Sequence, residues 1–455
     1  LMANTYLSRT PSSASNLKTW TWSGWVKRGS ISTGNQVLFE ARDSSGFFEK
    51  IQFISNDKLE YDHDIAGTDY TINSERVFRD TNGWYHIVVA RDTTQSTEAN
   101  RIKIYVNGEQ VTQTEVGLGY PPQNYDSFIN NTNVHYIGAN HGSEYFDGCM
   151  SHIHFVDGSA LAPTVFGETD TTTGEWKIKT DPSFTPGTNG FTVLKDGNTI
   201  TDQSTNSNNF ALAGGTLTKT EDNPSNVFAT MNTLNKENGG STLSLGNTKL
   251  VTTAQGGGPY TGRTVATLGA SSGKYYWEVK PTTDVANTYP VCAIVGEDFN
   301  VHDSSGYLSG NNSNSKSYIT FKMSSGGIAI NFTGSRVTAS YGNAVSANDI
   351  VGVALDLDNG KIFFSINGTW QNSGDPANGT NPASNSVGSL GGDIVFPAFG
   401  DENYSTSATM YVNFGNGYFG TTAVSSAGTN ASGIGIFEYD VPTGYTALST
   451  KGLNE

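Results

Sequence analysis

Residues 348–370 constrain the fold of this chain more than any other stretch. Two runs of alternating apolar residues flank the dipeptide Asn359-Gly360. Asn-Gly favours a two-residue type I′ turn, because both central positions of that turn need positive φ. Such a turn pairs Leu355 with Phe364 and lines up the neighbouring apolar side chains on one face. A hairpin with a wholly apolar face is marginal alone, so the sequence predicts a second sheet packed on it, as in a β-sandwich.

The first third of the chain has the same character. Aromatic-rich alternating runs at residues 19–26 and 84–90 predict strands, and residues 102–106 lead into a second Asn-Gly dipeptide, Asn107-Gly108. We expect a two-residue hairpin turn there as well. The chain is therefore predicted to be all-β.

Shifts in composition divide the chain into four parts. Residues 159–224 are rich in turn-forming residues, but short strands at residues 191–194 and 210–212 argue against a flexible linker. The tail is rich in Gly, Ser and Ala up to residue 433. The predicted division is a sandwich at 1–158, a connector with a few strands at 159–224, a sandwich at 225–420, and a C-terminal tail at 421–455 that packs on the second sandwich or leads from it.

The charge balance excludes several partners. The 455 residues include 26 basic and 42 acidic side chains, for a net charge of −16. A field of this sign repels phosphate backbones and anionic membranes, so nucleic acid is a poor candidate partner. No apolar run approaches the roughly 18 to 20 residues that span a bilayer, and we expect no membrane insertion. The N-terminus lacks the apolar core of a secretion signal, but a Leu ahead of a Met indicates a trimmed chain or an uncertain start, so this lack says little about export.

Several motifs of the second predicted sandwich resemble a SPRY domain, a two-sheet sandwich that recognises partners through its loops. They occur in the order expected for that family, at residues 273–279 (Gly-Lys-Tyr-Tyr-Trp-Glu-Val), 349–353 (Asp-Ile-Val-Gly-Val), 396–399 (Phe-Pro-Ala-Phe) and 412–415 (Val-Asn-Phe-Gly). The resemblance covers about 200 residues. It implies binding rather than catalysis.

The first third resembles the laminin-G-like branch of the concanavalin-A-like fold. The motifs that carry this resemblance are Tyr6-Leu7, residues 83–86 (Gly-Trp-Tyr-His) and residues 136–138 (Tyr-Ile-Gly) through 146–148 (Phe-Asp-Gly). Together the two resemblances imply two concanavalin-A-like or jelly-roll sandwiches in series, laminin-G-like and then SPRY-like.

The whole order, with a closing Pro-Thr-Gly-Tyr-Thr-Ala-Leu at residues 442–448, resembles structural proteins of marine tailed bacteriophages, including cyanophages. This resemblance implies a non-enzymatic protein on the exterior of the virion, as a head decoration, a fibre or part of the tail-fibre apparatus. Its expected partners are host-surface glycans and other virion proteins, with weak single-site binding multiplied over many copies. Two alternatives stay open: a polysaccharide depolymerase, and a purely architectural virion protein.

The depolymerase alternative depends on Glu60, Asp62 and Asp64. Alternate residues of a strand share a face, so these carboxylates would line up at intervals of roughly 6.5 to 7 Å. Some concanavalin-A-like glucanases arrange their nucleophile and acid in this way. Those enzymes have a glutamate where this chain has the shorter Asp64, which would change the distance between the carboxylates. The alternative is that the three acidic residues simply lie on the solvent-exposed face of an outer strand. We therefore expect no catalytic residues.

Rigid aromatic residues in loops are the predicted ligand-binding residues. Tyr120 and Tyr125 flank two consecutive prolines, and Trp370 begins a long polar loop. Aromatic rings beside Asn and Gln suit the C–H faces and hydroxyls of sugars, and suit protein surfaces equally. The alternative is that each ring tucks under the edge of its own sandwich.

No cofactor is expected, and calcium is the one metal candidate. Laminin-G-like sandwiches often bind calcium at a loop rim, and Asn140, Glu144 and Asp147 lie in such a loop here. The alternative is that these residues cap turns, which Asx side chains favour regardless of ligand.

Overall fold

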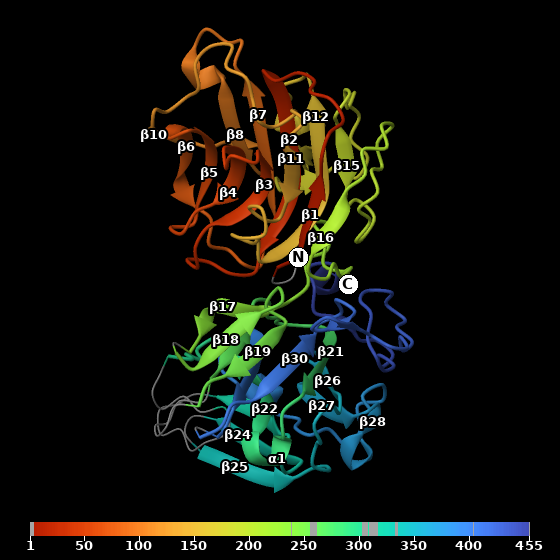
Figure 1. The fold of residues 1–455 in the computed structure, drawn as a ribbon. Helices are drawn as coiled ribbons and strands as arrows, with labels where there is room; N and C mark the ends of the chain where they lie inside the picture. Colours follow the sequence, from red (N-terminus) through yellow and green to blue (C-terminus); the bar gives the residue numbers. More distant parts are fainter. Residues whose placement is uncertain are drawn as a thin grey trace. The chain divides into compact units, whose positions relative to one another are not determined.

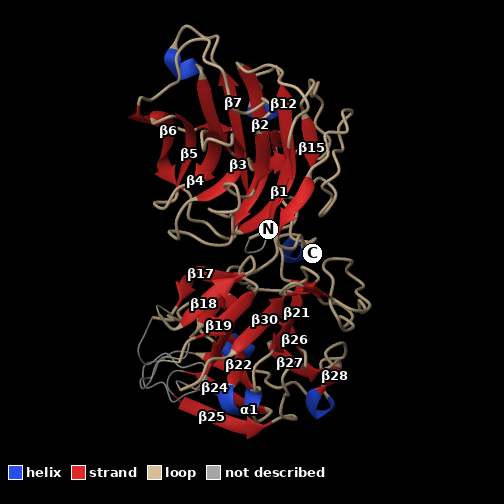
Figure 2. Cartoon of the chain, in the orientation of Figure 1, coloured by secondary structure: helices blue, strands red, loops and turns tan. Residues whose placement is uncertain are grey.

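The computed structural model describes residues 4–237, 239–254, 262–302, 308, 317–332, 335–403 and 405–454. The chain forms two compact units, Leu1–Lys219 and Thr220–Glu455. Strands dominate both units, with little helix, which confirms the all-β prediction (Figures 1 and 2). No helix within the described ranges is both long and apolar enough to span a membrane.

Unit 1 is a sandwich of two antiparallel sheets. In spatial order, the eight-stranded sheet contains β10 (Gln113–Gly117), β6 (Thr68–Val77), β5 (Lys58–Ile65), β4 (Phe48–Phe53), β3 (Gln36–Arg42), β11 (Val134–Ile137), β1 (Tyr6–Arg9) and β16 (Ala211–Gly214). The six-stranded sheet contains β15 (Phe191–Val193), β12 (Gly148–Asp157), β2 (Thr19–Arg28), β7 (Tyr85–Asp92), β8 (Ile102–Val106) and β9 (Glu109–Gln110). Short 3-10 turns lie at Glu98–Asn100 and Pro163–Val165.

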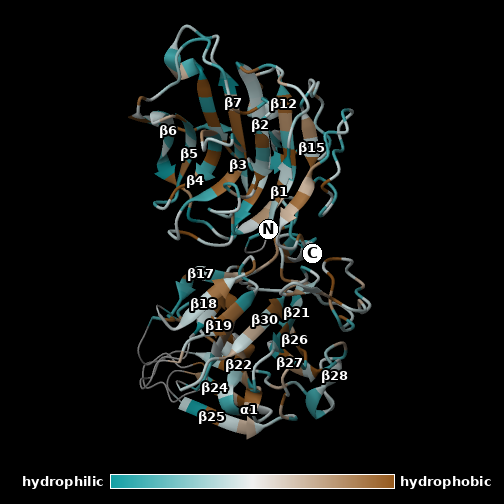
Figure 3. Cartoon of the chain, viewed as in Figure 1, coloured by the Kyte–Doolittle hydropathy of each residue, from teal (hydrophilic) through white to brown (hydrophobic). Residues whose placement is uncertain are grey.

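The core of unit 1 is formed by alternate residues of both sheets. Trp22, Phe39, Ile51 and Phe155 are among its fully or almost fully buried side chains. Figure 3 shows brown apolar and teal polar stretches along the strand ribbons, while the loops are mostly pale or teal. This is the pattern expected when one face of each sheet is buried.

The segment after the first sandwich packs back on unit 1. Its strands β15 and β16 pair with β12 and β1, and its hairpin of β13 (Gly167–Thr169) and β14 (Trp176–Ile178) carries Trp176. The Trp176 ring stacks on His86 of β7, and its Nε1 donates to His86 Nδ1 at 3.0 Å. Residues up to 219 therefore belong to the first compact unit.

Unit 2 is a second two-sheet sandwich. Its seven-stranded sheet contains, in order, β17 (Met231–Lys236), β20 (Thr264–Ala266), β29 (Val395–Asp401), β22 (Pro290–Gly296), β23 (Tyr318–Lys322), β24 (Gly327–Phe332) and β25 (Ser335–Ser340). The facing sheet contains β18 (Ser241–Ser244), β19 (Lys249–Thr252), β30 (Thr409–Asn413), β21 (Lys274–Pro281), β26 (Val351–Asp356), β27 (Lys361–Ile366) and β28 (Thr369–Trp370), with β33 (Thr446–Ala447) parallel to β21. The smaller elements are α1 (Val285–Thr288), the pair β31 (Tyr418–Phe419) and β32 (Thr422–Ala423), and 3-10 turns at Gln371–Ser373, Val387–Ser389 and Gly452–Asn454.

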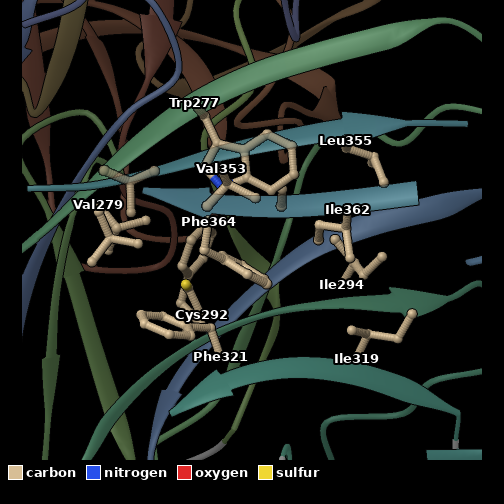
Figure 4. Close-up of a cluster of buried hydrophobic side chains, with 14 of the residues drawn as sticks. Trp277, Val279, Cys292, Ile294, Ile319, Phe321, Val353, Leu355, Ile362 and Phe364 are labelled. Atoms are coloured by element: carbon tan, nitrogen blue, oxygen red, sulfur yellow. The ribbon is translucent and has the colours of Figure 1, made fainter. Parts of the chain in front are cut away.

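The hairpin of β26 and β27 is covered by the opposite sheet, as predicted. Leu355 and Phe364 are 2% and 1% exposed. Figure 4 shows Phe364 pointing across the interior toward Phe321 of β23, and the two rings stack with centroids 4.9 Å apart. The central prediction, a hairpin whose apolar face is capped by a second layer of strands, is confirmed.

The predicted two-residue turn at Asn359-Gly360 is wrong. Asp356 pairs with Lys361, so the connection has four residues, 357–360, and only Gly360 of the dipeptide has positive φ. The Asp356 carboxylate accepts hydrogen bonds from the backbone N–H and the side-chain amide of Asn359 at 3.0 and 2.9 Å, which closes the longer loop. The register differs from the predicted one by two residues, an even number, so the apolar side chains keep their face.

Two other Asn-Gly dipeptides do form two-residue turns. Asn107 and Gly108 have φ of 51° and 83°, and the residues on either side of them, Val106 and Glu109, pair with each other. This confirms the prediction for the first unit. Asn367-Gly368 joins β27 to β28 in the same way.

The C-terminal tail lies on the outer face of the sheet that contains β21. Phe437, Val441 and Tyr445 are buried against Tyr276 of β21 and Phe363 of β27. The tail therefore covers apolar side chains that the two-layer core leaves outside. Strand β33 adds two backbone pairings to β21.

Candidate functional site

The eight-stranded sheet of unit 1 has two different faces. One face packs apolar side chains into the core, and the other carries charged side chains. Phe39, Ile51 and Tyr61 point into the core, so their neighbours along the strands point to the opposite face. We call this the polar face. It consists of Glu40 and Arg42 of β3, Lys50 and Gln52 of β4, and Glu60 and Asp62 of β5.

The strand register sets charges of opposite sign side by side. Glu40 pairs with Lys50, and Lys50 pairs with Asp62, so the ammonium group lies between two carboxylates across three strands. The Lys50 Nζ is 3.9 Å from Asp62 Oδ2, and its side chain is only 6% exposed. Buried charges require such partners, because desolvation of an isolated ion is costly.

Burial dominates the proton affinities on this face. It raises the pKa of Glu40 to about 7, against the opposing effect of Arg42 and Lys50. Burial also raises the pKa of Glu60 and, with a hydrogen bond to Asp69, that of Asp62. Glu40 is fully buried, and its Oε2 has no hydrogen-bond partner. This face therefore holds carboxyl groups that are partly protonated near neutral pH.

The loop between β11 and β12, residues 138–147, joins this face through the side chains of Asn140 and Glu144. Glu144 Oε2 accepts from Asn140 Nδ2 at 2.8 Å and from Lys50 Nζ at 3.4 Å. Arg42 Nη1 donates to Asn140 Oδ1 at 2.8 Å. Glu144 itself has a φ of 47°, a strained value for a residue with a side chain. The hydrogen bonds to the polar face hold the loop in this conformation.

Aromatic side chains flank the polar face. Tyr136 of β11 pairs with Glu40 in the register, and Tyr6 lies on the same face of β1. The Tyr6 ring is 6.1 Å from Tyr136 and 6.0 Å from Tyr145, between ring centroids. Tyr6 and Tyr145 are half-buried, so each keeps part of its ring open to solvent.

The structure places the three predicted carboxylates on β5, but in different roles. Glu60 and Asp62 belong to the polar face, where Glu60 accepts from Gln52 Nε2 at 2.6 Å. Asp64 accepts from the backbone N–H of Gly67 at 2.8 Å and so closes the turn between β5 and β6. The sequence alone predicted that Glu60 and Asp62 share a face. Glu40 and Lys50 come from other strands and gave no local signal, and Glu144 was predicted only as a calcium ligand.

The predicted calcium ligands are separated in the same way. Asn140 and Glu144 bond each other, while Asp147 lies close to Gly29, and burial raises its pKa. Within the ranges that the structure describes, no group of three His, Cys, Asp or Glu side chains is arranged to hold a metal ion.

Each of the predicted ligand-binding aromatic residues packs against its own sandwich. The Tyr125 ring lies 5.0 Å from Tyr70 and Tyr120 packs against the core of unit 1. The Trp370 ring lies 6.4 Å from Tyr276 of unit 2. All three predicted rings are half-buried. Each of these residues therefore contacts its own sandwich and, like Tyr6 and Tyr145, keeps part of its surface exposed, so its role in ligand binding stays a prediction.

Two antiparallel sheets packed face to face, with a polar outer face on the first sandwich, define a chain of two β-sandwich modules. Residues 2–165 match the family described as the concanavalin A-like lectin/glucanases superfamily, in its laminin-G branch, and residues 274–401 match the SPRY domain. The chain therefore carries a laminin-G-like domain followed by a SPRY domain, as the motifs indicated.

Solved structures that match parts of this chain share little sequence with it. The SPRY domain of human HERC1 has a TM-score of 0.27 and 16% identity, over 36% of this chain and 87% of that chain. The PSpry domain of TRIM65 has a TM-score of 0.29 and 14% identity, over 41% and 88%. A heptameric SAP-like pentraxin from Limulus polyphemus has a TM-score of 0.26 and 16% identity, over 35% and 71%. No curated protein matches the chain.

Proposed function

We propose that this protein is a non-enzymatic surface component of a tailed-phage particle that binds host-surface glycans through its laminin-G-like domain. The observation that carries the proposal is the polar face with its flanking tyrosines. The virion assignment is supported by the domain order and by the closing motif at residues 442–448, which resemble those of marine tailed-phage structural proteins.

The chemistry of the polar face suits a sugar. Tyr6 and Tyr145 offer ring surface for the C–H face of a pyranose, and a tyrosine contributes a hydroxyl as well. Asp62 is half-buried and offers carboxylate oxygens that accept from sugar hydroxyls. Apolar contact with a few placed polar groups is the usual composition of a small-molecule site. Many copies on one particle would multiply a weak interaction.

The engagement of the carboxylates favours binding over hydrolysis. Glu60 is held by Gln52, and Lys50 lies beside Asp62. A glycosidase needs one free carboxylic acid and one free carboxylate on either side of the scissile bond. Here Glu60 and Asp62 lie on one face of a single strand and each is engaged by a neighbouring side chain, an arrangement that supports binding rather than hydrolysis.

Glycan-array binding by the full chain tests the proposal. We expect binding to host-envelope glycans that is lost in Tyr145→Ala and retained in Tyr105→Ala, which alters a half-buried tyrosine on the other sheet of the same unit. Consistent absence of glycan binding would favour the purely architectural alternative. Release of reducing ends from host polysaccharide, abolished in Glu60→Gln, would favour the depolymerase.

A further inference from the structure

We propose that the polar face contains a self-modification site, in which Lys50 and Asn140 join through an intramolecular amide bond with Glu144 as the proton-transfer group. The bond would tie β4 to the loop between β11 and β12, two segments that are distant in sequence. It is independent of glycan binding, because it concerns the chemistry of the chain itself.

The hydrogen bonds place a nucleophile, a proton carrier and an electrophile together. Glu144 Oε2 accepts from both the Lys50 ammonium, at 3.4 Å, and the Asn140 amide nitrogen, at 2.8 Å. The two nitrogens are therefore neighbours on one oxygen atom. A carboxylate in this position can take a proton from the attacking amine and return it to the leaving amide nitrogen.

The carbonyl group of Asn140 is polarised by a fixed cation. Arg42 Nη1 donates to Asn140 Oδ1 at 2.8 Å, where negative charge develops when an amine adds to the carbonyl carbon. A pre-oriented charged donor at that atom lowers the barrier to acyl transfer, as an oxyanion hole does. Asn35 also donates to Glu144, at 3.4 Å on Oε1, but no described donor holds its carbonyl oxygen. The geometry therefore selects Asn140.

The surroundings exclude water from the nucleophile. Lys50 is 5% exposed, and its Nζ lies 4.5 Å from the centre of the Phe48 ring. Glu40, fully buried and paired with Lys50 in the sheet, has a carboxyl oxygen without a partner. Natural proteins rarely bury such an atom without a reason. A neutral Glu40 acid in this position would favour the uncharged product over the starting ammonium group.

The reaction balances without a cofactor. Glu144 takes a proton from the Lys50 ammonium, and the neutral amine adds to the side-chain carbonyl carbon of Asn140. Glu144 passes this proton to the amide nitrogen and the C–N bond breaks. The second proton, which the attacking nitrogen loses as the new amide forms, passes through Glu144 to the departing ammonia. The products are one secondary amide and one ammonium ion, with no oxidant or reductant consumed. The fold holds the amine of Lys50 at a high effective concentration beside the amide of Asn140, so no external activating group is needed.

Mass spectrometry of the folded full chain tests this proposal. We expect an intact mass lower than that of the sequence by one ammonia, and a branched proteolytic peptide that joins Lys50 to Asn140. Succinimide formation at an Asn-Gly step also releases ammonia, so the branched peptide is the decisive product. A chain whose Lys50 peptide is recovered entirely in linear form overturns the proposal.

Three variants assign the roles. Lys50→Arg keeps the cation but cannot form the amide, and Glu144→Gln removes the proton carrier. Both should abolish the branched peptide, as should Asn140→Ala. Lys58→Arg, a matched change at the start of β5, should leave the branched peptide intact. If the Glu144→Gln variant still forms the branched peptide, the proposed role of Glu144 as proton carrier is wrong.

Discussion

The carboxylate of Glu278, fully buried in β21, accepts the backbone N–H of Tyr439 at 2.9 Å. The N–H of Glu438 and the amide of Asn413 bond the same side chain at 3.0 and 3.2 Å. One buried acidic residue thus ties the C-terminal tail to the sheet that it covers. Burial raises the pKa of Glu278 to about 7, in opposition to these hydrogen bonds.

Glu278→Ala should loosen the tail. The change leaves two part-buried backbone N–H groups without an acceptor, and we expect a loss of about 1 to 3 kcal/mol in the free energy of unfolding. Hydrogen exchange at residues 436–440 measures the effect locally. Glu278→Gln keeps one acceptor oxygen and should lose less. Equal exchange rates in the wild type and both variants would show that the tail is held by Phe437 and Tyr445 instead.

Stability should depend on pH through Glu40. Its pKa rises from about 4.5 in the unfolded chain to about 7 in the folded chain. The folded state binds the extra proton between these values, so the contribution of Glu40 to stability is present below pH 4.5 and is lost as the pH rises to about 7.

Glu40→Gln removes this titration. The free-energy difference between wild type and variant should therefore shift by about 3 kcal/mol between pH 4.5 and 7.5, in favour of the variant at the higher pH. Denaturant unfolding at a series of pH values measures it. Parallel pH profiles for the two proteins would contradict a raised pKa at this residue.

Phe364 should be a major determinant of stability in unit 2. It stacks on Phe321 of the facing sheet and is 1% exposed, so Phe364→Ala removes contacts between the two layers. We expect a loss of about 3 to 5 kcal/mol in denaturant unfolding. Val337→Ala, at a residue that is 63% exposed on edge strand β25, should stay within about 0.5 kcal/mol.

Two glycines with positive φ should respond differently to alanine. At Gly108, an added Cβ would lie 2.5 Å from the Trp176 ring, whereas at Gly360 nothing lies closer than 3.8 Å. Gly360→Ala should cost only the backbone strain of about 1 to 2 kcal/mol. Gly108→Ala should cost more, and it should change the tryptophan fluorescence because the ring must leave His86. Similar losses in both variants would mean that Trp176 moves freely.

The hairpin turns show how well local sequence predicts turn type in this chain. Asn107-Gly108 and Asn367-Gly368 adopt the two-residue turn, while Asn359-Gly360 does not. The difference is Asp356, whose carboxylate bonds Asn359 and closes a loop of four residues. Turn type is decided by small energies, and a nearby Asx side chain offers the backbone an alternative.

The candidate site shows that local sequence also fails to predict which residues from other strands become neighbours. Strand alternation alone predicted that Glu60 and Asp62 share a face. It did not predict Lys50 or Glu40 beside them, since that depends on which strands are neighbours in the sheet. Glu144 was singled out as a calcium candidate, whereas in the fold its carboxylate holds a lysine and an amide.

The sequence by itself determined that this protein consists of two β-sandwiches, because apolar alternation with a period of two needs a second layer to bury it, and the segments available for that layer are strands as well. The register shift in the hairpin left that outcome unchanged, since an even shift preserves the buried face. Only the tertiary structure decided which charged side chains meet on the outer face of the first sandwich and what the tail covers. Those contacts join residues far apart in the chain, where periodicity carries no information about partners.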